Sequence, residues 1–165
     1  MVATSIGEPA SVEPQMIVTP LAPTPDTRGL SLSVAAKSLG ELDGIRDIHI
    51  AEIRPGQVRG NHYHLRRTEL IAVAYDGSWS LHWDTGPNTP TETRSFTGTG
   101  GMLISAPRTW SHAIRNDGVS SIWIVALSDI ELDHNAQDDS ARDVYRREIA
   151  SPRGSAAISD ATRTL

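Results

Sequence analysis

Apolar and polar residues alternate with a period of two along most of the chain, and no stretch before Ser128 sustains a helical period. Such alternation places successive side chains on opposite faces of a β-strand. Short turn sequences rich in Gly, Pro, Asn and Asp separate the alternating segments. The strands that this pattern predicts are 16–20, 30–34, 48–53, 57–64, 69–76, 78–84, 91–97, 101–106, 110–116 and 121–128. The chain is therefore expected to be all-β, as a sandwich or a small barrel.

The two ends of the chain differ in composition from this β region. Residues 1–15 are rich in Ala, Ser, Glu and Pro and are predicted to be a disordered arm. A single domain is expected over residues 16–150, with one short helix over 138–149 that Asp139 or Ser140 caps. Residues 151–165 are expected to be a flexible tail. One domain agrees with the length of 165 residues.

Charge and cysteine content narrow the class of partner and the compartment. The formal net charge is −5, which argues against a nucleic acid or an anionic membrane as the main partner. The chain has no cysteine, so it forms no disulfide and suits a reducing compartment. No signal peptide and no apolar run of about 20 residues occurs. The protein is therefore expected to be soluble and cytoplasmic.

A cluster of potential metal ligands lies in the segment RGNHYHLRRTE, which runs from Arg59 to Glu69. In a strand, His62 and His64 project from the same face because they are two residues apart. After a short link, Glu69 can return a carboxylate from the next strand. Two imidazoles and one carboxylate form a ligand set for a divalent first-row metal that leaves coordination positions open. His112, at the start of a later strand, can supply a third imidazole.

The residues alone leave a second interpretation open. Paired histidines on one strand can be half-exposed barrel residues, and a single histidine such as His112 is more often structural than a ligand. The combination of the two segments favours metal binding over this alternative. The expected cofactor is one divalent ion per chain, with Zn or Fe first, although the same ligands accept Mn, Ni or Cu.

These two segments resemble the two sequence motifs of the cupin family. The first motif corresponds here to Gly56, His62, His64, Glu69 and Gly77, and the second to Gly101, Pro107, His112 and Asn116. Two features depart from the pattern: the first motif has one residue more than usual before Gly77, and Thr109 stands where the family has a glycine two residues after the proline. The resemblance covers about residues 26–128. It implies a jelly-roll barrel of two packed sheets that holds the metal inside and often assembles as a homodimer.

A narrower resemblance concerns the enzymes of sugar-nucleotide chemistry. The segments RGNHYH, WSHAIRNDG and ALSDIELDHNAQDDSARDVY are similar to the C-terminal cupin domain of the bifunctional UDP-sugar reductase/epimerase of capsule synthesis. That resemblance implies an epimerase or isomerase acting on a 4-keto nucleotide sugar. The reductase domain of that family is not in this sequence, so the activity is expected to stand alone or to work beside another protein. In dTDP-4-dehydrorhamnose 3,5-epimerase, a related cupin, a glutamine stands in place of His64 and no metal is held.

The same resemblance, together with strand parity, suggests which residues act on the substrate. Arg28 in the segment PDTRG and Arg59 in RGNHYH match the sugar-nucleotide motifs and are the expected diphosphate-binding residues. His82 is the candidate general base, if the polar parity of its strand faces the cavity, and a solvent-facing histidine is the alternative. Arg66 and Arg67 are interpreted as solvated surface charges.

Two further functions share this metal-binding motif. A small cupin with open metal positions can be an iron dioxygenase or a lyase acting on a small metabolite. It can also be a non-catalytic module that binds a sugar. Arg28 and Arg59 favour the epimerase, whereas the absence of a reductase domain counts against it. The sequence identifies neither the sugar nor the nucleotide.

Overall fold

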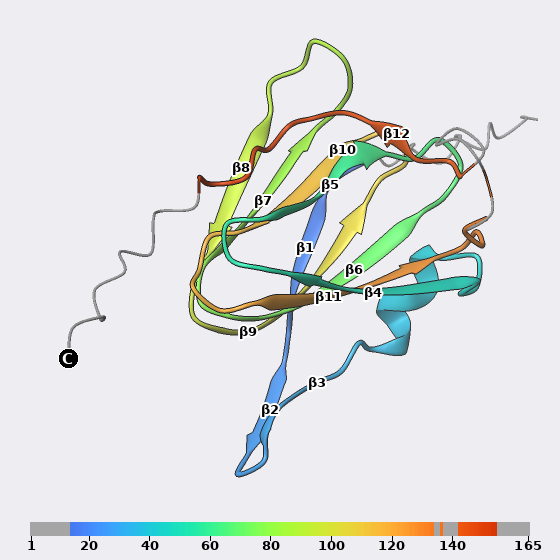
Figure 1. The fold of residues 1–165 in the computed structure, drawn as a ribbon. Helices are drawn as coiled ribbons and strands as arrows, with labels where there is room; N and C mark the ends of the chain where they lie inside the picture. Colours follow the sequence, from blue (N-terminus) through green and yellow to red (C-terminus); the bar gives the residue numbers. More distant parts are fainter. Residues whose placement is uncertain (1–13, 134–135, 137–141, 155–165) are drawn as a thin grey trace, which may run out of the picture.

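The structure is a computed structural model that describes residues 14–133, 136 and 142–154. Two five-stranded antiparallel sheets pack face to face as a barrel (Figure 1). The first sheet has the order β1 (Ile17–Leu21), β9 (Thr99–Ala106), β6 (Glu69–Asp76), β11 (Ile122–Ser128) and β4 (Asp47–Ile53). The second has the order β12 (Tyr145–Arg146), β5 (Val58–Tyr63), β10 (Ser111–Asn116), β7 (Trp79–Asp84) and β8 (Glu92–Phe96). The expectation of an all-β jelly roll is confirmed.

Every strand predicted from the alternating pattern is present, but two elements differ from the prediction. The segment from Pro23 to Gly29 lies between two of the predicted strands, but it contains strand β2 (Pro23–Asp26), which pairs with β3 (Gly29–Leu32) in a projecting hairpin (Figure 1). The helix predicted over residues 138–149 is wrong in its described part. Arg142 and Asp143 form a turn, and the next residues form β12, because they hydrogen-bond to the edge of β5. Residues 138–141 lie outside the described residues.

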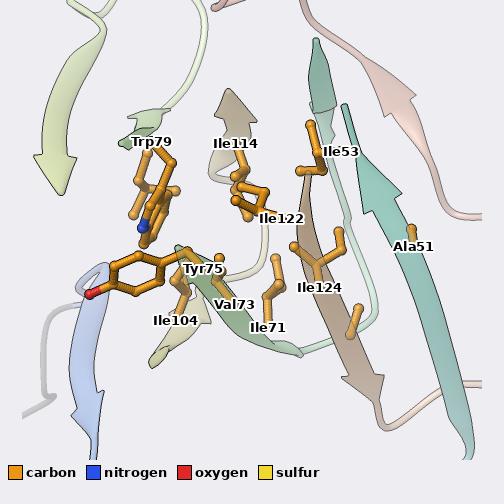
Figure 2. Packing of buried hydrophobic residues seen from close by; sticks show 12 residues of the cluster. Ala51, Ile53, Ile71, Val73, Tyr75, Trp79, Ile104, Ile114, Ile122 and Ile124 are labelled. Carbon is orange, nitrogen blue, oxygen red and sulfur yellow. The ribbon is translucent and has the colours of Figure 1, made fainter. Parts of the chain in front are cut away.

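The apolar core fills the space between the two sheets. The inward side chains of β6 and β11 meet those of β7 and β10, as Figure 2 shows for Val73, Ile124, Trp79 and Ile114. Each fully buried side chain of this size contributes about 1.5–3 kcal/mol through the hydrophobic effect. The core supports the barrel without any of the predicted metal ligands, since none of them belongs to it.

The outer face of the first sheet is covered only in part. The 3₁₀ helix η1 (Ala36–Glu41) and the following Leu42 lie over one end of this face, where Leu42 packs with Leu21, Leu70 and Leu103. The β4 side of the same face is open. Within the described part of the chain, no helix is long and apolar enough to cross a membrane.

The segment after β12 is tied across the second sheet by polar contacts. Arg147 forms an ion pair with Asp84 at 2.8 Å. The side-chain amide of Asn61 donates to the carbonyl of Ala150 at 2.8 Å and accepts from its N–H at 3.0 Å. Arg153 forms an ion pair with Asp117 at 3.0 Å, so these contacts extend into the region predicted as a tail. Residues 1–13 of the predicted arm and 155–165 of the predicted tail lie outside the described residues.

Candidate metal centre and adjoining cavity

The four predicted metal ligands converge at one end of the barrel. His62, His64, Glu69 and His112 each offer a ligand atom, and these atoms lie within 4.8 Å of one another. His62 and His112 are directly paired across β5 and β10, while Glu69 begins β6 in the facing sheet. The short loop 64–68 carries the chain from one sheet to the other. The predicted clustering is therefore present in the fold.

The imidazole of His62 is held neutral by its surroundings. Its ring centroid lies 4.8 Å from that of His64 and 4.9 Å from that of His112. Burial, reinforced by the two neighbouring imidazoles, lowers the pKa of His62 from 6.5 to about 3. A neutral imidazole has the lone pair that metal coordination requires.

Glu69 supplies the negative charge of the cluster. Its Oε2 lies 3.1 Å from Nε2 of His112 and 3.6 Å from Nε2 of His64. Burial by itself would raise the pKa of Glu69, but the two imidazoles hold that pKa well below its ordinary value. The site therefore presents one carboxylate among three imidazoles.

The tautomer of His64 is fixed by a hydrogen bond behind the ring. Its Nδ1 lies 2.6 Å from the backbone carbonyl oxygen of Asp143, and a carbonyl can only accept, so Nδ1 carries the hydrogen. The lone pair of a neutral His64 is then on Nε2, which faces the cluster. This buried Nε2 has no hydrogen-bond partner among the described residues. A metal ion fits this donor set, because orphaned buried nitrogens are rare.

Asp143 also supports the loop that carries His64. Its carboxylate is fully buried and accepts the backbone N–H groups of Leu65, Arg66 and Arg67, at distances of 3.0–3.3 Å. Burial raises the pKa of Asp143, but these three hydrogen bonds outweigh that effect and lower it. The ionised side chain therefore holds the loop, while the backbone of the same residue holds the His64 ring.

A bulge in β5 determines where Arg59 points. The register pairs His112 with His62 and Ala113 with Gly60, so that Asn61 is an extra residue on β5. Asn61 has φ of 57° and Gly60 has φ of 95°. A Cβ at Gly60 would lie 2.5 Å from the carbonyl oxygen of His112, which leaves room for glycine only. Because of the bulge, Arg59 pairs with the core residue Ile114 and shares the face of His62.

A cavity of about 370 Å³ opens beside the four clustered residues. His62, His64 and Glu69 form part of its wall. Its cationic lining residues are Arg59, Arg67, Arg142 and Arg146, and its acidic ones are Asp47 and Glu69. The cavity is therefore lined by more cations than anions, although the chain as a whole has a net charge of −5.

The two predicted diphosphate-binding arginines lie in different places. Arg59 lines the cavity, and its Nε donates to the carbonyl of Glu52 at 2.7 Å. Arg28 lies at the tip of the β2–β3 hairpin, where it is exposed and forms an ion pair with Asp26. The hairpin projects away from the barrel (Figure 1), so the fold does not bring Arg28 to the cavity of its own chain.

The prediction that His82 faces the metal cluster is wrong. His82 pairs with Ala113, whereas its neighbour Trp83 pairs with His112, so His82 lies on the opposite face of the sheet. There its ring is held between Ser80 at 2.9 Å and Thr93 at 3.0 Å. Burial lowers its pKa, and the residue acts in a polar network outside the barrel.

His49, which no sequence motif indicated, faces the site instead. It pairs with the core residue Ala126 and lines the cavity together with His62 and Glu69. A second cavity of about 110 Å³ brings His49 and His112 into the same lining. The alternating pattern of β4 would have indicated His49 only if the face of that strand that points into the barrel were known.

Thr109 takes the backbone conformation of the glycine that the cupin pattern has at this position. Its φ is 69°, in the left-handed region that a β-branched residue seldom enters. Its N–H donates to the carbonyl of His64 at 2.6 Å, which ties the turn before β10 to the end of β5. The turn therefore forms with threonine, at a cost in backbone strain.

Comparison with protein families finds one family whose model matches most of the chain. The family described as polysaccharide biosynthesis C-terminal domain matches residues 26–140. No curated protein sequence matches the chain. The matched range contains all four clustered residues but ends before Asp143.

Several solved structures share the fold. The capsular polysaccharide assembling protein CapF from Staphylococcus aureus is 20% identical, with a TM-score of 0.54 over 79% of this chain and 33% of CapF. This chain thus spans about a third of CapF. A dTDP sugar isomerase from Desulfovibrio desulfuricans G20 is 16% identical, with a TM-score of 0.62 over 81% of this chain and 84% of its own. QdtA, a sugar 3,4-ketoisomerase from Thermoanaerobacterium thermosaccharolyticum in complex with TDP, is 13% identical, with a TM-score of 0.56 over 80% and 88%. These likenesses confirm the cupin fold.

Proposed function

Since the chain belongs to the family of polysaccharide biosynthesis C-terminal domains, we propose that it is an isomerase or epimerase of a nucleotide-linked keto sugar. The observation that carries the proposal is the convergence of three imidazoles and one carboxylate beside an arginine-lined cavity. The names of the structural neighbours agree with it, because they include a dTDP sugar isomerase and a sugar 3,4-ketoisomerase.

We propose that His62, His64, Glu69 and His112 hold one divalent metal ion. The neutral state of His62 and the orphaned Nε2 of His64 support this assignment. Zn and Fe are the first expectations, and Mn, Ni or Cu suits the same ligands. When bound, the ion would supply a Lewis acid toward the oxygen of a keto group.

The chain's own residues would perform the remaining tasks of the reaction. Moving a proton at a carbon beside a keto group needs a base near that carbon, and we assign this role to an imidazole nitrogen of His49. Arg59 shares the cavity wall with His49, and its planar guanidinium suits a diphosphate. The bulge at Asn61 serves this arrangement because it turns Arg59 to the side of His62.

The test is to incubate the protein in D₂O under nitrogen with each of a panel of 4-keto nucleotide sugars. Mass spectrometry of the recovered sugar then measures proton exchange. We expect deuterium to enter the sugar without oxygen. The variant His49→Gln should slow the exchange by roughly 10²–10⁴-fold and leave the metal content unchanged. The variant Arg59→Ala should mainly raise KM, since it removes binding common to the ground and transition states.

One set of results would favour a dioxygenase activity over the proposed isomerase activity. Turnover that consumes oxygen and requires iron, with no deuterium in the recovered sugar, contradicts the isomerase. Binding of a sugar nucleotide without exchange or turnover, in protein that retains its metal, would instead indicate a non-catalytic binding module.

A further inference from the structure

Arg67 is buried in the cavity wall, contrary to the prediction that it is a solvated surface charge, and it has no counter-ion among the residues that the structure describes. Its relative exposure is 4%, and the backbone N–H of Arg67 is bound by Asp143. Within the described part of the chain, the guanidinium makes one hydrogen bond, from Nη2 to the carbonyl of Arg142 at 2.7 Å. Its Nε is buried and has no partner, and among the described residues no carboxylate forms an ion pair with it.

Two other partly buried arginines of this chain, Arg115 and Arg147, are paired with carboxylates. Arg115 forms an ion pair with Asp117 at 2.6 Å, and Arg147 with Asp84 at 2.8 Å. A buried cation is costly unless a counter-charge compensates it. Arg67 is more buried than either of these arginines, so the absence of such a pair in the described residues requires another explanation.

The position of Arg67 supplies that explanation. Arg67 lines the same cavity as His64 and Glu69, three and two residues away in the chain. Arg142, which also lines this cavity, directs its guanidinium to the carbonyl of Ala136 at 2.8 Å and likewise has no carboxylate partner among the described residues. Two guanidinium groups that form no ion pair with any described carboxylate therefore lie beside the candidate metal cluster.

We propose that Arg67 is the primary anion-binding residue of the cavity, and that it takes an anionic oxygen group of the ligand next to the metal cluster. The group is a phosphate or a carboxylate, since both match the planar fork of a guanidinium. This inference deepens the proposed function and rests on it for the identity of the ligand. It adds that the anion binds deep in the cavity, at a residue other than the exposed Arg59.

The test measures anion binding to metal-free protein by calorimetry at constant ionic strength, with inorganic pyrophosphate in one arm and malonate in the other. We expect wild-type protein to bind at least one of them. The variant Arg67→Met, which keeps the length of the side chain without its charge, should weaken that binding about tenfold or more. Arg66→Met is the matched control, because the Arg66 side chain is 62% exposed, and it should bind as wild type does.

The two arms distinguish the source of the anion. If Arg67→Met weakens the binding of pyrophosphate, the group that Arg67 binds is the diphosphate of a nucleotide sugar. If the variant weakens the binding of malonate alone, that group is a carboxylate on the sugar. Equal binding by wild type and Arg67→Met, or no binding of either anion by wild type, would overturn the proposal. Because the protein is metal-free and no turnover is measured, failure of the isomerase reaction would leave these results unaffected.

Thermal unfolding separates anion binding from a structural role. Without anion, Arg67→Met should unfold at the wild-type temperature or above it, because an uncompensated buried charge has been removed. The bound anion should then raise the unfolding temperature of wild type but not that of the variant. A large drop for Arg67→Met with no anion effect on wild type would show a structural residue. The variant Arg67→Lys keeps the positive charge but not the planar guanidinium, and it should lose less anion affinity than Arg67→Met does.

Discussion

Nδ1 of His64 lies 2.6 Å from the backbone carbonyl oxygen of Asp143, a residue 79 positions further along the chain. This hydrogen bond leaves Nε2 of His64 directed at Glu69. The carboxylate of the same Asp143 binds the loop between His64 and Glu69. One residue of the C-terminal segment therefore positions a candidate metal ligand through both its backbone and its side chain.

Replacing Asp143 should weaken the site without touching a ligand. The variant Asp143→Ala leaves three backbone N–H groups without their acceptor, and it should reduce metal affinity by roughly 10–100-fold, as loss of a supporting hydrogen bond does. Competition with a chromogenic chelator measures that affinity. Glu148→Ala changes an exposed residue of the same segment and is the control. Equal affinities for all three proteins would contradict the positioning role.

Two of the buried histidines, His64 and His82, should respond differently to substitution. His64→Ala should reduce the metal content of purified protein from about one ion per chain to a small fraction, since one of four ligands is lost. His82→Gln should keep the metal, because His82 lies on the other face of the sheet. Elemental analysis of both variants checks this. Little metal in the wild-type protein would refute the metal assignment itself.

The stability of metal-free protein should depend on pH through His62. Its pKa is about 3 in the folded state and near 6.5 when unfolded, so the unfolded state binds the extra proton between these values. The free energy of unfolding should therefore fall as pH decreases from 6.5, by up to about 1.4 kcal/mol per pH unit. Urea denaturation between pH 5.5 and 6.5 measures this slope, above the range in which most carboxylates titrate. His62→Gln should flatten it, and an unchanged slope would show that His62 is not the cause.

Relieving the strain at Thr109 should stabilise the protein. A left-handed conformation costs a non-glycine residue about 1–2 kcal/mol, whereas glycine loses about 0.5–1 kcal/mol through the flexibility of its unfolded chain. Thr109→Gly should therefore raise the free energy of unfolding by up to about 1 kcal/mol. The control is Thr91→Gly, at an exposed position without a positive φ, which should destabilise the protein. A loss of stability in both variants would mean that the turn is not strained.

We predict that the chain is a homodimer that uses the open outer face of the first sheet. Ile48 and Ile50 of the edge strand β4 are exposed there, together with Trp123 of β11. Apolar side chains on an edge strand favour association with a second copy. Light scattering should give a dimer for wild type and a monomer for Ile50→Lys. Val119→Lys is the control, since Val119 is 94% exposed in a turn. A monomeric wild type would refute the prediction.

The strands and the ligand cluster could be predicted because both follow from local periodicity. Two-residue spacing places His62 and His64 on one face in any strand, and the short loop to Glu69 limits where the carboxylate can go. The turn at Thr109 formed even without its glycine, since contacts on both sides impose it. Spacing along the chain was therefore sufficient to predict which residues form the cluster.

The residues around the cluster could not be predicted, because parity does not tell which face of a strand is inside. On β4 the isoleucines at 48 and 50 are the more apolar set, yet they face outward and His49 faces the cavity. The same ambiguity misplaced His82. Arg67 and Asp143 meet only through the fold, across 76 residues, and no local pattern reports such a contact.

The dependence of His64 on Asp143 also sets an order of events during synthesis. All four clustered residues leave the ribosome before the C-terminal segment that fixes the His64 ring and its loop. A nascent chain that has not yet extended to Asp143 therefore presents the imidazoles without their final alignment. The proposed metal site should therefore reach its full affinity only when residues 142–154 dock against the barrel.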